Sequence, residues 1–165
     1  MKKLFYSVFV VVAMAAVGCS SDSNDDTNNN NDNDNDNPIE TVNFLNYNLN
    51  GTDVVSVPGT SYLEDMILVR ADYYSGGVAV NSLSLWMPAD ITVGTHPFEE
   101  PAFDNNVYSA STWVNGNEIV GADTGSLVIT NITPTYFEGT FSFTGINDNE
   151  TEAVVTSGTF RAGLY

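Results

Sequence analysis

Apolar and polar residues alternate along the chain after residue 38, and this period of two constrains the fold more than any other feature. In residues 67–72 the odd positions are apolar, and the even positions carry the charges. Residues 78–87 repeat the pattern, with three large apolar residues on one face. Such alternation is typical of β-strands with one buried face, and no stretch has the apolar spacing of a helix. Residues 38–165 are therefore predicted to form one all-β domain.

Turn residues separate these alternating segments. The glycine-rich residues 73–77 predict a hairpin between the two segments named above. Asn115-Gly116 predicts a second hairpin, between residues 107–114 and 117–121, because both central positions of a type I′ turn need positive φ. Further strands are expected at residues 126–132, 136–144 and 152–164, with Gly158 at a bulge or a close backbone approach. About nine or ten short antiparallel strands are expected in all, as a β-sandwich or a flattened β-barrel.

The N-terminus has the pattern of a secretion signal. Lys2 and Lys3 precede an apolar run, residues 4–17, that ends in small residues at Cys19. The run is shorter than the roughly 20 residues that a membrane-spanning helix needs. Residues 1–18 are therefore predicted to be a signal peptide that is removed.

The residues Ala16-Val17-Gly18-Cys19 resemble the lipobox of bacterial lipoproteins. The resemblance implies that the signal is cleaved before Cys19 and that the thiol of Cys19 is diacylated. An ordinary signal peptide with a cysteine at its cleavage site is the alternative. Because Cys19 is the only cysteine, its modification leaves no thiol for a disulfide, a metal or a nucleophile. Two or more acyl chains make a stable membrane anchor.

A polar tether follows the anchor, so that residues 19–37 form a segment of their own. Residues 20–37 are all Ser, Asp, Asn or Thr, and such a composition predicts disorder because nothing can be buried. Asp22, Asp25 and Asp26 are similar to the lipoprotein export signal of Bacteroidota, which implies display on the outer face of the outer membrane. Simple solubility is the other interpretation of these acids.

The charge of the chain excludes two kinds of partner. The formal net charge is −17, and it becomes −19 once Lys2 and Lys3 leave with the signal peptide. Arg70 and Arg161 are then the only cationic side chains. Phosphate backbones and anionic headgroups repel such a polyanion, so neither nucleic-acid binding nor electrostatic membrane docking is expected.

Three segments of the domain resemble the C-terminal signature of an uncharacterised Bacteroidota surface lipoprotein family. They are residues 125–130 (GSLVIT), 137–143 (FEGTFSF) and 156–160 (TSGTF). Residues 83–88 (LSLWMP), with the Gly-Thr pair at residues 94–95, are similar to an upstream strand and turn of the same family. The resemblance implies an antiparallel β domain on a lipid anchor and carries no known active site.

No catalytic constellation is recognisable, and we expect no enzyme activity. His96 is the only histidine, and no Gly-x-Ser-x-Gly nucleophile elbow occurs. One histidine and a lipidated cysteine are too few ligands for zinc. A glycosidase with two facing carboxylates remains an alternative, although the sequence selects no pair of acids.

Calcium is the one cofactor that the sequence leaves open. The loop of residues 96–106 gathers hard oxygen donors, with Glu99, Glu100 and Asp104 as the carboxylate ligands. A solvated acidic connection is the ordinary interpretation of the same residues.

The two tryptophans are the candidate ligand-binding residues. Trp86 alternates onto the face opposite Leu83 and Leu85, and Trp113 shares a face with neighbouring serines. An exposed indole beside hydroxyl groups is suited to stacking on a sugar ring. Burial at an edge of the sandwich is the alternative.

These features together predict a surface-exposed, membrane-anchored lipoprotein with a non-catalytic binding or envelope-interaction domain. Its expected partners are the membrane, through the lipid, and a glycan or an envelope protein. A carbohydrate-active enzyme and a calcium-stabilised structural subunit are the alternatives.

Overall fold

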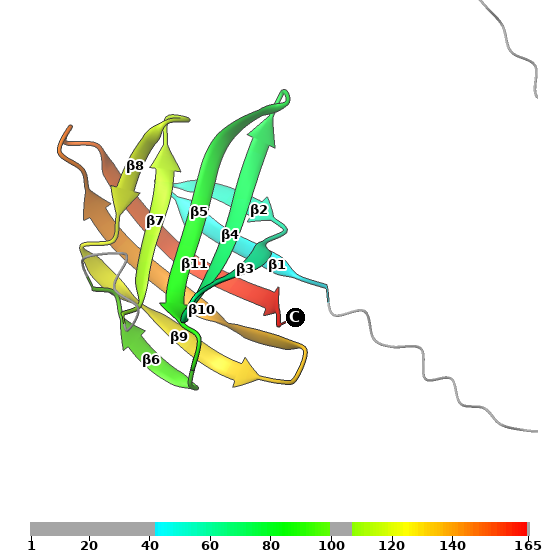
Figure 1. Ribbon diagram of the computed structural model, residues 1–165. Coiled ribbons are helices and arrows are strands. Elements are labelled where there is room, and N and C mark those ends of the chain that lie inside the picture. Colours follow the sequence, from blue (N-terminus) through cyan, green and yellow to red (C-terminus); the bar gives the residue numbers. More distant parts are fainter. Residues whose placement is uncertain (1–41, 100–106, 165) are drawn as a thin grey trace, which may run out of the picture. The chain divides into compact units, whose positions relative to one another are not determined.

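The structure, a computed structural model, describes residues 42–99 and 107–164. These residues form eleven β-strands and no helix, arranged as two antiparallel sheets packed in a sandwich (Figure 1). In chain order the strands are β1 (Phe44–Leu49), β2 (Thr52–Ser56), β3 (Gly59–Leu63), β4 (Met66–Ser75), β5 (Val78–Pro88), β6 (Gly94–Pro97), β7 (Ser109–Val114), β8 (Glu118–Gly121), β9 (Thr124–Ile132), β10 (Tyr136–Ile146) and β11 (Glu152–Gly163).

The predicted all-β sandwich is confirmed, and the strand count exceeds the expected nine or ten. β2 and β3 have five residues each and β6 has four. All three lie at sheet edges. Segments this short contain too few residues to display a clear alternation, and edge strands bury less of their surface.

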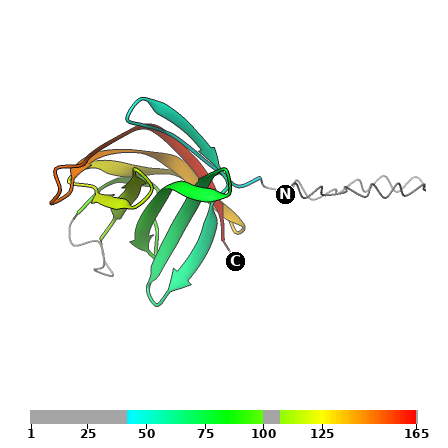
Figure 2. The same cartoon turned by 90° about the horizontal axis from the view of Figure 1, so that it is seen from above.

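One sheet has six strands, in the order β2-β1-β11-β10-β9-β6, and the other has five, in the order β3-β4-β5-β7-β8. The chain changes sheet after β2, β5, β6 and β8. Seen from above, β4 and β5 belong to one layer, and β10 and β11 to the other (Figure 2). The core lies between these layers.

Both predicted hairpins are present. β4 and β5 are joined through Gly76 and Gly77, which have φ values of 62° and 83°. β7 and β8 are joined through Asn115 and Gly116, with φ values of 54° and 84°. Positive φ at both central residues is what a type I′ turn requires, and Asn-Gly adopts it at low cost.

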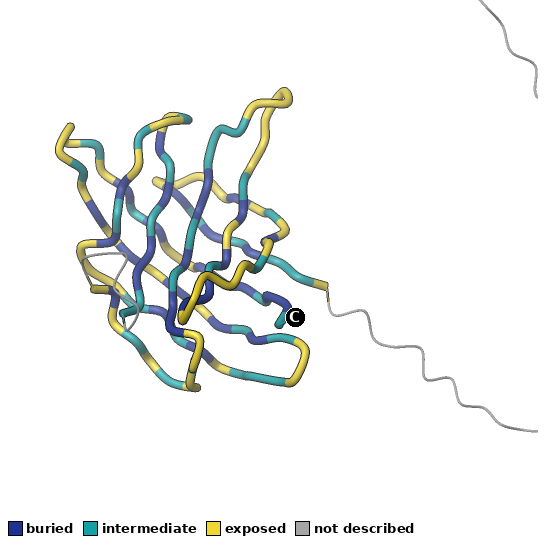
Figure 3. Tube along the Cα trace, viewed as in Figure 1, coloured by how far each residue is buried: buried dark blue, intermediate teal, exposed yellow. Residues whose placement is uncertain are grey.

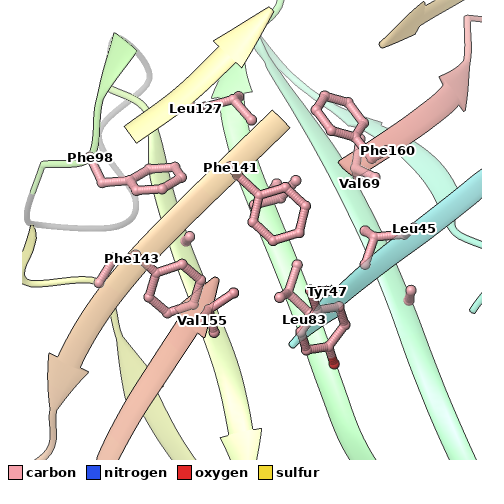
Figure 4. Packing of buried hydrophobic residues seen from close by; sticks show 14 of the residues in the cluster. Leu45, Tyr47, Val69, Leu83, Phe98, Leu127, Phe141, Phe143, Val155 and Phe160 are labelled. Atoms are coloured by element: carbon pink, nitrogen blue, oxygen red, sulfur yellow. The ribbon is translucent and has the colours of Figure 1, made fainter. Parts of the chain in front are cut away.

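Alternation places one face of each long strand in the core, as the colouring by burial shows (Figure 3). Phe141, Phe143 and Phe160 of the six-stranded sheet meet Val69 and Leu83 of the five-stranded sheet (Figure 4). All five side chains are at most 3% exposed. Each large apolar side chain buried in this way stabilises the fold by about 1.5–3 kcal/mol.

Gly158 lies at both of the features predicted for it. A Cβ atom at Gly158 would come within 2.5 Å of the carbonyl oxygen of Phe141, so only glycine fits without displacement. Beside it, the register between β10 and β11 shifts after Phe141, and Ser157 has a φ of 54°. One extra residue in β11 at this point forms a β-bulge.

Two polar side chains, Thr112 and Tyr47, are buried in the apolar interior. The hydroxyl of Thr112 donates to the carbonyl oxygen of Ser82 at 3.0 Å. Burial raises the pKa of Tyr47 to about 12, and the charge of Asp72 adds to the rise. Tyr47 is therefore uncharged in the core.

Candidate functional site

The two tryptophans lie on the outer face of the five-stranded sheet. Trp86 of β5 is opposite Ser109 of β7, and its strand neighbours Leu85 and Met87 are buried in the core. Trp113 of β7 is opposite Ile119 of β8 on the same outer face. Both indoles are half-buried. Both tryptophans thus lie on the polar face predicted for them. Neither indole is as exposed as a platform for sugar stacking would be.

Arg70 of β4 covers the ring of Trp113. The guanidinium carbon lies 5.5 Å from the centroid of the indole, within the range of a cation–π interaction. Arg70 is opposite Ser84 of β5, which is opposite Ser111 of β7, so the arginine reaches across β5 to the tryptophan. Small serine side chains on β5 leave room for this contact. A bulky residue there would block it.

Asp72 fixes the other side of the same guanidinium. Nε of Arg70 donates to Oδ1 of Asp72 at 3.1 Å, and Nη2 forms an ion pair with the same oxygen at 3.0 Å. The two side chains are two residues apart on β4 and therefore share its outer face. They are 44% and 28% exposed, and ion pairs at such exposure contribute only about 0–1 kcal/mol to stability. The pair orients the guanidinium more than it stabilises the fold.

A hollow of about 370 Å³ opens beside this pair. One wall is the outer face of β4, with the side chains of Leu68, Arg70, Asp72 and Tyr74. Tyr74 is 60% exposed and is the large aromatic surface of the hollow. We call this region the β3–β4 hollow.

The rest of the lining of the β3–β4 hollow consists mainly of small side chains. Gly59 and Ser61 of β3 line it together with Val57, which precedes that strand. A Cβ atom at Gly59 would meet no atom within 4 Å, so this side is open. The volume lies at the lower end of the roughly 300–1,000 Å³ typical of small-molecule sites.

Sequence reasoning did not select Arg70, Asp72 or Tyr74. One signal was available, because Arg70 is one of two cations outside the predicted signal peptide and stands at an outward position of an alternating strand. Its proximity to Trp113 could not be read from the sequence, since 42 residues separate the two positions.

Of the predicted calcium ligands, the structure describes Glu99 alone, which is exposed. Its backbone N–H donates to the carbonyl oxygen of Tyr108 at 2.8 Å. Glu100 and Asp104 lie outside the described residues. Within residues 42–99 and 107–164, no three His, Cys, Asp or Glu side chains gather as a metal site would require. The calcium site stays a prediction.

The single histidine has a structural environment. The ring of His96 stacks on Tyr108, with centroids 4.0 Å apart and planes 9° from parallel. Its Nε2 is 2.9 Å from the carbonyl oxygen of Thr92. His96 lies on β6 of the six-stranded sheet, whereas the β3–β4 hollow lies on the five-stranded sheet.

The predicted lipid anchor Cys19 lies outside the described residues. Within the described part of the chain, no helix is long and apolar enough to cross a membrane. Comparison of the chain with protein-family models, with curated proteins and with solved structures found no match.

Proposed function

We propose that this protein is a lipid-anchored, surface-exposed lipoprotein whose β-sandwich binds an extracellular glycan without catalysing a reaction. The lipobox-like residues ending at Cys19 support the anchor, and the acidic tether supports display on the outer membrane. The resemblance to Bacteroidota surface lipoproteins supports the same location.

The observation that carries the binding function is the composition of the β3–β4 hollow. It presents an exposed aromatic ring, that of Tyr74, beside a charged donor and acceptor, Arg70 and Asp72. Sugars have apolar ring faces and a polar rim of hydroxyl groups, and this combination of side chains matches both.

The same hollow supports binding over hydrolysis. Asp72 is the only carboxylate among the described residues that line it, and Arg70 is hydrogen-bonded to that carboxylate. Glycosidases need two carboxyl groups on either side of the scissile bond. One paired acid is insufficient for this mechanism.

Tryptophan fluorescence of the purified full chain tests the proposal. A glycan that contacts Arg70 changes the contact between Arg70 and Trp113, so the emission of Trp113 is expected to shift or be quenched. The volume of the hollow lies at the lower end for small-molecule sites, so the titration extends to millimolar glycan concentrations. The Trp113→Phe variant, which retains Trp86, is the control and should lose the signal. An unchanged emission across a broad panel of oligosaccharides would argue against glycan binding.

A second candidate function, docking on an envelope protein, is favoured by the sheet edge at β2. Val55 of this end strand and Val57 just after it are 71% and 74% exposed. Exposed apolar residues on an unpaired edge are suited to strand addition by a partner. Co-purification of a defined envelope protein after gentle detergent extraction, lost in Val55→Lys, is the expected result. A chain that always purifies alone would contradict this function.

A further inference from the structure

We infer that the β3–β4 hollow selects an uncharged sugar unit, with two neighbouring hydroxyl groups bound by Arg70 and Asp72 and its apolar face on Tyr74. This inference rests on the proposed glycan-binding function and specifies the ligand class of that site.

The charges of the hollow support an uncharged ligand. Arg70 and Asp72 are its only charged side chains among the described residues, and they neutralise each other. The chain around them is strongly acidic, with a net charge of −17 before the signal lysines are removed. A glycan with carboxylate groups would meet this negative field without a free cation in the hollow to compensate it. A neutral sugar avoids that cost.

The contact between Arg70 and Asp72 leaves one donor group of the arginine and one acceptor oxygen of the aspartate available. Nε of Arg70 donates to Oδ1 of Asp72, and Nη2 lies 3.0 Å from the same oxygen. Within residues 42–99 and 107–164, Nη1 of Arg70 and Oδ2 of Asp72 make no further hydrogen bond. A hydroxyl group both donates and accepts, so two adjacent sugar hydroxyls can bond Nη1 and Oδ2 together. Hydrogen bonds to charged groups are among the stronger ones.

Trp113 holds the arginine in place before the ligand arrives. Its indole lies against the guanidinium, whose carbon is 5.5 Å from the ring centroid. A guanidinium restrained by both an aromatic ring and a carboxylate loses little freedom on binding. Trp113 is therefore a positioning residue, and the contacts to ligand come from Arg70, Asp72 and Tyr74.

Calorimetric titration of the full chain with matched neutral and acidic oligosaccharides tests the selectivity. The probes are gluco- and manno-oligosaccharides on one side and oligogalacturonate on the other. Neutral probes are expected to bind, with an affinity that changes less than about twofold between low and high salt, because screening acts only on charged partners. Oligogalacturonate is expected to bind at least about tenfold more weakly.

Two pairs of variants connect the binding to the hollow. Tyr74→Ala should weaken neutral-sugar binding about tenfold, whereas Tyr73→Ala, its exposed neighbour on β4, should not. Asp72→Asn removes one negative charge and leaves the positive charge of Arg70 uncompensated. The preference of this variant should therefore change toward oligogalacturonate. Asp65→Asn makes the same charge change outside the hollow and should leave the preference unchanged. Thermal melts of each variant verify that it is folded.

The possible outcomes bear on both glycan binding and the inferred preference for an uncharged sugar. Neutral binding that depends on Tyr74 supports both. Tyr74-dependent binding that favours oligogalacturonate in the unmodified chain overturns the inferred ligand class and leaves glycan binding intact. Binding of no probe, or binding that Tyr74→Ala does not change, overturns both.

Discussion

Outside the predicted signal peptide the chain has two cationic side chains, and both occupy the same kind of environment. Arg70 lies over Trp113 and pairs with Asp72 on one sheet. Arg161, on the other sheet, lies 4.6 Å from the ring centroid of Tyr136 and pairs with Glu138. Each guanidinium is held by a ring and a carboxylate. The two arginines differ in position, because Arg70 lines a hollow, whereas Arg161 of β11 forms a cross-strand ion pair with Glu138 of β10.

The Arg161–Glu138 pair predicts a specific dependence of stability on pH. Both Nε and Nη2 of Arg161 donate to Oε2 of Glu138, at 2.8 and 2.6 Å. This hydrogen bonding holds the pKa of Glu138 below its usual 4.5. A lowered folded pKa stabilises the protein above the unfolded pKa, and that stability is lost as the pH falls through the folded pKa.

Glu138→Gln should therefore lower the Tm by a few degrees at neutral pH, corresponding to at most about 1 kcal/mol. The difference from the unmodified chain should close as the pH falls from about 5 toward 2. Thermal melts across this pH range measure the Tm difference. Glu118→Gln, which removes an acid elsewhere in the domain, is the comparison variant. A Tm difference that stays constant with pH would contradict the lowered pKa of Glu138.

At the scale of the element, β10 combines three core phenylalanines with inward-facing glycines. Gly139 and Gly145 lie on the same face as Phe141 and Phe143, where other strands approach closely. A Cβ atom at Gly139 would be 2.0 Å from the carbonyl oxygen of Val128, and one at Gly145 would be 1.8 Å from that of Gly121. β10 thus approaches β9 and β8 at positions where a side chain would not fit.

Gly139→Ala should destabilise the domain by about 1–3 kcal/mol or more, because the backbone of β9 must move to admit one methyl group. Chemical denaturation of the full chain measures this. Gly59→Ala is the matched control: no atom lies within 4 Å of the added methyl group and the residue has no positive φ. Equal stabilities of the two variants would show that β9 moves freely, contrary to the packing described above.

For the whole molecule, the two outer faces of the sandwich have different characters. The six-stranded sheet presents rows of threonine and serine along β9, β10 and β11, together with the Arg161–Glu138 pair and Tyr136. The five-stranded sheet presents the β3–β4 hollow with its aromatic and charged side chains.

The anchor is tested by Cys19→Ser expressed from the native signal. The unmodified chain should incorporate labelled palmitate and partition into a detergent phase, because acyl chains supply its membrane affinity. The variant should do neither and should be recovered in the aqueous phase. Antibody labelling of intact cells reports whether the unmodified chain faces outward. Detergent partitioning that survives in Cys19→Ser would contradict the lipid anchor.

Calcium binding is tested by the melting temperature of the full chain. A ligand that binds the folded state alone raises the Tm, so calcium at millimolar concentration should raise it if residues 96–106 bind the ion. Replacement of Glu99, Glu100 and Asp104 together by their amides should abolish the increase. The absence of any shift in the unmodified chain would remove calcium from consideration.

Local patterns in the sequence were sufficient for the all-β class, for both hairpins and for the faces of Trp86 and Trp113. Alternation reports which side of a strand is buried, and Asn-Gly or Gly-Gly reports where the chain reverses. Both signals depend on neighbouring residues alone.

The tertiary structure decided the division into six and five strands, the short edge strands and the contact of Arg70 with Trp113. These depend on which distant segments pair, and sequence periodicity contains no information about that choice. The β3–β4 hollow exists only because a long strand with charged outward residues lies beside a short edge strand with small ones. The amino-acid sequence supplies those side chains, and strand pairing brings them together.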